Sequence, residues 1–192
     1  MGKKVICEKP LSFDPADLQR LLGVRNIFTV MQLRHHPIME ELREKKIETC
    51  ELYVKVKRGE DYWNGWKGDE DRSGGILFNI GVHYFDALFQ LFGNNCYEMK
   101  KTVNERNRVE GYLKFYNFGS PVKFTISVDD TDKEQDRYLL INGDKYRFSN
   151  QDNLSYEDLH KKVYEEFLAG RGVHPVDLID LTRFIKRLKD HV

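Results

Sequence analysis

Cysteine is scarce and long apolar runs are absent in this sequence of 192 residues. Its three cysteines, Cys7, Cys50 and Cys96, lie far apart and form no CxxC pair. That spacing argues against a disulfide framework and favours free thiols in a reducing compartment. No apolar run approaches the ~18 residues of a membrane-spanning helix, and the N-terminus lacks the apolar stretch of a signal peptide. We therefore expect a soluble, cytoplasmic protein without a membrane partner.

An excess of charge of either sign is also absent, because 31 basic residues balance 31 acidic ones. A nucleic-acid binder needs surplus positive charge to displace counterions, so no nucleic-acid partner is expected. A local basic pocket for a small anion is still compatible with this balance. The apolar fraction of 40% is enough for a packed core, which argues against disorder.

The hydrophobic pattern of the first 34 residues predicts a strand, a short helix and a second strand that pair in parallel. Residues 3–7 form the first strand, and Asp14-Pro15 begins the helix as N-cap and first helical residue. The nearly continuous apolar run at 26–33 has the composition of a strand that is covered on both faces.

The remainder of the chain reads as an α+β pattern, an open and mainly antiparallel sheet with helices on one face. Strand 49–57 alternates apolar and polar residues, residues 58–75 read as a long polar loop, and residues 75–92 form an apolar helix. Further strands are expected at 96–103, 109–117, 122–128, 138–141 and 146–148, and further helices at 38–45, 156–169 and 176–189.

The apolar helix carries polar groups that suit proton transfer. Asn79 and His83 are four residues apart and share a helix face, with Asp86 on an adjacent part of it. A histidine exchanges protons near neutral pH, and a lysine such as Lys9 beside it suits the interconversion of an alcohol and a ketone. A lone histidine on an apolar helix is more often a satisfied core residue than a catalyst, and Lys9 taken alone is a surface lysine.

A metal site is not expected. The adjacent His35 and His36 would point to opposite faces of a strand, and no cysteine or carboxylate joins them and His83 at ligand spacing.

Five blocks, in order along essentially the whole chain, resemble the Gfo/Idh/MocA family of nicotinamide-dependent sugar oxidoreductases. Within that family they are most similar to the bacterial UDP-N-acetylglucosaminuronate 3-dehydrogenases, which serve lipopolysaccharide O-antigen synthesis. The blocks are EKP (8–10), QLRHHP (32–37), WKGD…SGG (66–75), GG…GxHxxD (74–86) and DLHKKVYEEFLAGRG (158–172).

The resemblance implies two domains, a Rossmann domain followed by a sheet domain that binds substrate. No GxGxxG phosphate turn occurs in this sequence, so residues 1–36 are interpreted as a remnant of the C-terminal part of the Rossmann domain, in an N-terminally truncated enzyme. Residues 37–192 are interpreted as the substrate-binding and oligomerisation domain. The family's cofactor is NAD(H), which we expect to bind weakly or not at all to this chain alone.

The resemblance also implies roles for single residues. Lys9 would lie beside the nicotinamide and the substrate hydroxyl, with Glu8 and Pro10 at the cofactor, and His83 would be the acid/base. Many members have an aspartate where this chain has Asn79, which would orient groups rather than relay a proton. The candidates for holding a UDP-sugar uronate are Arg34, His36, Tyr62, Trp66, Lys67, Ser73, His160 and Tyr164. Arg34 would clamp a carboxylate or phosphate. Tyr62 and Trp66 would lie against uracil or sugar or, as an equal alternative, anchor their loop into the core.

Two classes of function stay open at this point. The chain is either the catalytic half of a dehydrogenase that oxidises a sugar 3-hydroxyl, or a non-catalytic module for sugar-nucleotide binding or oligomerisation. A homo-oligomer would pair through the exposed sheet face, which we expect to carry an apolar patch that includes Tyr112, Phe115 and Phe124.

Overall fold

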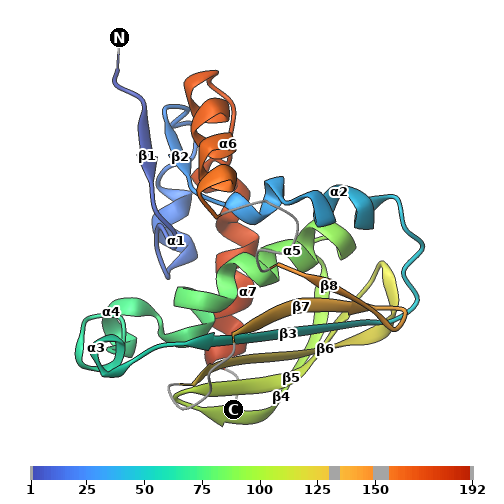
Figure 1. The fold of residues 1–192 in the computed structure, drawn as a ribbon. Coiled ribbons are helices and arrows are strands. Elements are labelled where there is room, and N and C mark those ends of the chain that lie inside the picture. Colours follow the sequence, from blue (N-terminus) through green and yellow to red (C-terminus); the bar gives the residue numbers. More distant parts are fainter. Residues whose placement is uncertain (1, 130–134, 149–155, 191–192) are drawn as a thin grey trace.

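A six-stranded mixed sheet is the base of the fold, and helices cover one of its faces (Figure 1). A separate two-stranded sheet lies on the far side of these helices. The computed structural model describes residues 2–129, 135–148 and 156–190. The small sheet pairs β1 (Val5–Cys7) with β2 (Ile27–Thr29) in parallel. The large sheet has the order β4-β5-β6-β3-β7-β8 and consists of β3 (Cys50–Lys57), β4 (Cys96–Glu105), β5 (Arg108–Phe115), β6 (Phe118–Asp129), β7 (Asp136–Ile141) and β8 (Asp144–Arg147).

Every pairing in the large sheet is antiparallel except that of β3 with β6. The predicted α+β class and the mainly antiparallel sheet are therefore confirmed. The helical elements are α1 (Pro15–Gln19), η1 (Gln32–His35), α2 (Pro37–Arg43), α3 (Glu60–Asn64), α4 (Glu70–Ser73), η2 (Leu77–Gly81), α5 (Val82–Phe92), α6 (Tyr156–Leu168), η3 (Pro175–Leu178) and α7 (Ile179–Asp190).

The core lies between the large sheet and α5. Strand β3 buries Leu52, Val54 and Val56 on one face, as its alternation predicts. Opposite them, the ring of Phe85 packs edge-on against Phe124, with centroids 5.6 Å apart. The buried face of each strand therefore points toward the helix layer, which Figure 1 shows above the sheet.

The prediction that Phe115 and Phe124 lie on the exposed sheet face is wrong. Both are 1% exposed and pack under α5, because their positions alternate with outward residues in the same parity as the core of β3. The open face instead carries Tyr53 stacked on Tyr138, 5.0 Å between centroids, and Tyr112 among charged side chains. An oligomer through this face stays a proposal.

Two stretches fold differently from their predicted conformations. Residues 58–75 are not one loop, because they contain α3 and α4, and the carboxylate of Asp69 caps α4 by accepting from the amide of Asp71. The strand expected at 26–33 ends at Thr29 and is followed by the 3₁₀ turn η1. An apolar run alone does not distinguish a covered strand from a buried turn.

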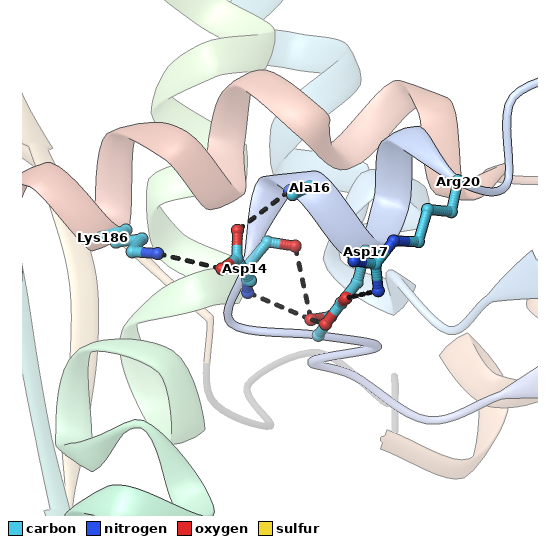
Figure 2. A network of polar contacts seen from close by, with 6 residues as sticks. Asp14, Ala16, Asp17, Arg20 and Lys186 are labelled. Atoms are coloured by element: carbon cyan, nitrogen blue, oxygen red, sulfur yellow. Dashed lines mark hydrogen bonds and ion pairs between the residues drawn. The ribbon is translucent and has the colours of Figure 1, made fainter.

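The N-cap of α1 links the first βαβ unit to the last helix. Asp14 accepts a hydrogen bond from the amide of Ala16 at 2.9 Å, and its second oxygen meets Lys186 of α7 at 3.2 Å (Figure 2). Asp17 and the C-cap residue Arg20 form an exposed ion pair, and the hydroxyl of Ser12 links Asp17 to the backbone of Asp14 in the same network. The predicted cap is confirmed, and it also places α1 against α7.

Helix α6 covers the two-stranded sheet. Phe167 packs edge-on against Phe28 of β2 at 5.4 Å between centroids, and Thr29 bridges to Val173. Residues from both predicted domains therefore share one packed region, and we retain a boundary near residue 36 only as a proposal. The segment Glu70–Phe92 has the length and apolar composition of a membrane span, but 72% of an apolar 18-residue stretch in it is buried inside the protein.

Candidate functional site

A cleft of about 360 Å³ opens where β1, η1, β3, η2, α5 and β7 meet. It is lined by Lys9, Gln32, Val56, Arg58, Lys67, Asn79, Ile80, His83, Tyr84 and Arg137. Lys9, Asn79 and His83, which the sequence pattern groups, therefore border one space. A hollow of similar volume, about 350 Å³, lies on the open sheet face. Its lining residues include neither a histidine nor a buried lysine, so the chemistry is assigned to the first cleft.

A π-helical turn positions Asn79. Residues Leu77–Gly81 form η2, and π turns interrupt helices most often at functional sites. The backbone oxygen of Asn79 accepts a hydrogen bond from the ammonium of Lys9. Its side-chain amide donates to the hydroxyl of Tyr62 at 3.2 Å. Asn79 thus joins the end of β1 to α3, which agrees with an orienting role.

The glycine pair before this turn is required by backbone geometry. Gly74 and Gly75 have φ values of +75° and +72°, in the left-handed region that favours glycine. A Cβ on Gly74 would lie 2.6 Å from the Cβ of Phe78 and 2.9 Å from the ring of Phe13. The pair therefore allows close side-chain packing where α4 turns into the helix that carries Asn79 and His83.

His83 is buried, with 8% of its surface exposed, and its Nδ1 has no hydrogen-bond partner among the described residues. Burial lowers the pKa of His83 well below its usual value, and the charges of Lys9 and His160 lower it further. The imidazole is therefore neutral at physiological pH.

Lys9 is the most perturbed cation of the cleft. Burial lowers its pKa from 10.5 to about 8; Glu8 opposes this shift, and the charges of Lys67 and Arg58 add to it. A lysine whose pKa is near the working pH can hold a proton next to a reacting oxygen and also release it.

Positive charge dominates the cleft, whose lining includes Lys9, Arg58, Lys67 and Arg137. None of the described residues that line it is acidic. Arg58, Arg137 and Gln32 are functional candidates that were not predicted from the sequence. Arg58 continues the inward parity of Val54 and Val56, and Arg137 lies opposite Val54 in the strand register. An arginine at an inward-facing strand position is a signal that sequence alone provides.

Arg34 has an internal partner. Its guanidinium binds both oxygens of Asp86 at 2.8 and 2.7 Å, and the carboxylate side chain is only 3% exposed. Arg34 is also absent from the lining of the cleft. The guanidinium clamps Asp86 and so joins η1 to α5, and the predicted clamp of Arg34 on a ligand stays a proposal.

Most of the other predicted ligand residues are absent from the lining of the cleft. His36 caps α2 by accepting from the amide of Ile38 at 3.3 Å, and Ser73 accepts from the amide of Gly75 at 3.1 Å. Trp66 is 52% exposed and Tyr164 46% exposed. His160 acts on His83 through its charge. Lys67 lines the cleft directly, and the hydroxyl of Tyr62 accepts a hydrogen bond from Asn79, which lines it. The positions of Lys67 and Tyr62 therefore agree best with their predicted roles.

We expect Asn79→Asp to raise the pKa of Lys9 from about 8 toward its ordinary 10.5, because the variant adds a negative charge to the cleft that Lys9 and Asn79 both line. A pH titration of ¹³C-labelled lysine side chains by NMR measures this shift. Asn79→Ala is the matched control, since it keeps the carbonyl that Lys9 contacts and adds no charge. An equal shift in both variants would contradict the expectation.

Among the described residues, no group of three or more His, Cys, Asp or Glu side chains is placed to hold a metal ion. Among the described residues, Lys9 after β1 and Gln32 at the start of η1 line the cleft, and these two side chains would be the ones to contact the reacting end of a nicotinamide dinucleotide. The side-chain oxygen of Gln32 is buried without a hydrogen-bond partner among the described residues.

The chain thus combines a mixed sheet, covered on one face by helices, with a lysine and a neutral histidine at one cleft, and comparison with known families identifies it as the C-terminal domain of an oxidoreductase. The family model described as "Oxidoreductase family, C-terminal alpha/beta domain" matches residues 44–166. The chain belongs to the Gfo/Idh/MocA oxidoreductase family, as the five sequence blocks indicate.

Solved structures agree with this assignment. The WlbA (WbpB) dehydrogenase from Thermus thermophilus, in complex with NAD and UDP-GlcNAcA, is 31% identical, with a TM-score of 0.84 over 98% of this chain. The same enzyme with NAD and α-ketoglutarate gives 30% identity and a TM-score of 0.85 over 97% of the chain. The UDP-N-acetylglucosamine 3-dehydrogenase GnnA from Acidithiobacillus ferrooxidans shares the fold, with a TM-score of 0.73 at 14% identity; 98% of this chain and 70% of that chain are covered. The chain spans 65% and 64% of the two WlbA chains.

Proposed function

We propose that this chain is the substrate-binding part of a nicotinamide-dependent sugar oxidoreductase that oxidises C3 of a UDP-linked N-acetylamino uronic acid. In the group that the sequence resembles, this reaction serves lipopolysaccharide O-antigen synthesis. The observation that carries the proposal is the convergence of Lys9, Asn79 and His83 on one cleft with four cationic and no acidic lining residues among those described. A sugar nucleotide with a carboxylate is a polyanion, so its charge is complementary to this cleft.

The groups in the cleft suit alcohol oxidation. His83 is neutral and accepts the proton of the substrate hydroxyl at its imidazole, while the ammonium of Lys9 stabilises the oxygen as it becomes negative. Asn79 holds Lys9 through its backbone oxygen and Tyr62 through its side chain, and takes no proton itself. A bound nicotinamide would accept the hydride that leaves C3 with its electron pair. Removal of the proton and the hydride together converts the alcohol to a ketone.

Binding of the sugar nucleotide tests the substrate half. Isothermal titration calorimetry of the chain with UDP-GlcNAcA is expected to show saturable binding that weakens as salt rises, because the contacts are ionic. Lys67→Gln should weaken it, whereas Lys46→Gln, at a side chain that is 87% exposed and paired with Glu48, should not. Equal affinities in the two variants, or no binding by the unaltered chain, would refute the proposal.

Cofactor binding is expected to be weak. The 192 residues contain no GxGxxG turn to hold a pyrophosphate, so a fluorescence titration with NADH should show no submicromolar binding. Submicromolar binding would show that the groups after β1 and β2 suffice for the dinucleotide.

A further inference from the structure

The positive charge of the cleft is divided between two regions. Arg58 and Lys67 both lower the pKa of Lys9, so these three cations lie near one another. Arg58 also acts on the hydroxyl of Tyr62, which places this group beside α3. Arg137 is not among the charges that shift Lys9, although it lines the same cleft. It enters from β7, in register with Val54 of β3. Val54, its partner in the register, lies four positions before Arg58 along the chain, so Arg137 enters the cleft at a different point from Arg58. The cleft therefore has three cations at the α3 side and a single arginine at the β7 side.

The proposed substrate has its charge divided in a similar way. A UDP-linked uronic acid carries its diphosphate at C1, its reacting hydroxyl at C3 and its carboxylate on C5, at alternating corners of the sugar ring. Because Lys9 and His83 line the same cleft and the charge of Lys9 reaches the imidazole, the proposed function places the hydroxyl between those two side chains. The diphosphate, with about two negative charges, matches Arg58 and Lys67. The carboxylate, with one charge, matches the remaining arginine.

We infer that Arg137 is the residue that recognises the uronate carboxylate and so selects an acidic sugar nucleotide over its neutral counterpart. This inference rests on the proposed function and deepens it. Arginine suits the task, because its planar guanidinium binds a carboxylate through two parallel hydrogen bonds.

The position of Arg137 is fixed by the sheet. The next inward-facing residues of β7, Leu139 and Ile141, are fully buried, and Leu139 pairs with Leu52. One terminal nitrogen of Arg137 donates to the side-chain oxygen of Gln135. β7 is paired on both sides, with β3 and β8. A side chain on such a strand is placed more reproducibly than one on a loop, and a contact that determines specificity requires this.

Selectivity, rather than affinity alone, tests this inference. Calorimetry compares UDP-GlcNAcA, UDP-GlcNAc and UDP on the unaltered chain and on Arg137→Gln. We expect the unaltered chain to favour the uronate. Arg137→Gln should weaken uronate binding at least ~10-fold and leave UDP-GlcNAc and UDP within about twofold, because only the carboxylate loses its partner. Arg58→Gln is the matched control and should weaken all three ligands together.

Each remaining outcome has a defined meaning. An equal loss of all three ligands in Arg137→Gln would assign Arg137 to the diphosphate, and unchanged selectivity would remove it from recognition; both overturn the inference alone. Failure of the unaltered chain to bind UDP-GlcNAcA would overturn the proposed function together with the inference. Thermal denaturation checks that Arg137→Gln folds. Should it not fold, Arg137→Lys retains the charge without the fork and is expected to show reduced selectivity.

Discussion

Arg34→Met is expected to lower the free energy of unfolding by about 3–5 kcal/mol, since removal of one partner leaves an uncompensated charge in the interior. Asp86, on α5, is 3% exposed in its side chain and takes both of its hydrogen bonds in this pair from Arg34, at 2.7 and 2.8 Å. Urea denaturation followed by circular dichroism measures the loss. The effect should be large because the pair joins η1, directly after β2, to the helix that carries His83.

Two further variants show whether burial is the cause. Arg20→Met removes the exposed partner of Asp17, at 3.0 Å but with side chains 79% and 52% exposed, and should cost less than about 1 kcal/mol. The double variant Arg34→Met, Asp86→Leu should recover most of the loss, because no charge is then left buried. If Arg34→Met proved no more destabilising than Arg20→Met, the pair would be without structural importance.

The same pair shows the limit of inference from sequence. Arg34 and Asp86 are 52 positions apart, and nothing in the local pattern of either predicts that they meet. Local features are predicted well: the alternation of β3 identifies its buried face, and Asp14-Pro15 identifies the start of α1. Both depend on neighbours within a few residues. By contrast, α3 and α4 are not predicted, because short polar helices with glycines nearby lack the apolar period that marks a helix.

The candidate site likewise combines residues that the sequence groups with residues that only the tertiary structure brings together. Resemblance and helical spacing group Lys9, Asn79 and His83, and the cleft does bring them together. Arg137 reaches the cleft only because β7 pairs with β3 in one particular register, which sequence does not specify. Its inward parity with Leu139 is nevertheless readable once the strand is recognised. Charged residues at inward-facing strand positions are therefore useful candidates for binding sites, because burial of a charge is costly unless a partner offsets it.

Lys9→Met is expected to stabilise the fold at pH 7 while it weakens ligand binding. The pKa of Lys9 is about 8 in the folded chain, against the ordinary lysine value of 10.5 that applies to the unfolded chain, so retention of its proton inside the cleft costs up to about 3 kcal/mol. The variant also loses the hydrogen bond to Asn79, worth about 1 kcal/mol, so a net gain of about 1–2 kcal/mol is expected. Groups that are unfavourable for stability but are retained are characteristic of functional sites.

The dependence on pH gives this prediction its sharpest test. Between about pH 8 and 10.5 the unfolded chain holds more protons on Lys9 than the folded chain does, so the stability of the unaltered protein rises with pH in that window. The advantage of Lys9→Met should therefore be full below pH 8 and decline toward pH 10.5, as urea denaturation at several pH values would show. Lys161→Met, at an exposed position on α6, is the control and should give no such trend.

Calorimetry should also show that Lys9→Met weakens the binding of UDP-GlcNAcA at least ~10-fold, because the ligand loses a cation at its reacting hydroxyl. Suppose instead that Lys9→Met is less stable than the unaltered chain at pH 7, or that its gain in stability does not change with pH. Burial would then not lower the pKa of Lys9, and the proposed role of Lys9 at the hydroxyl would lose its physical basis.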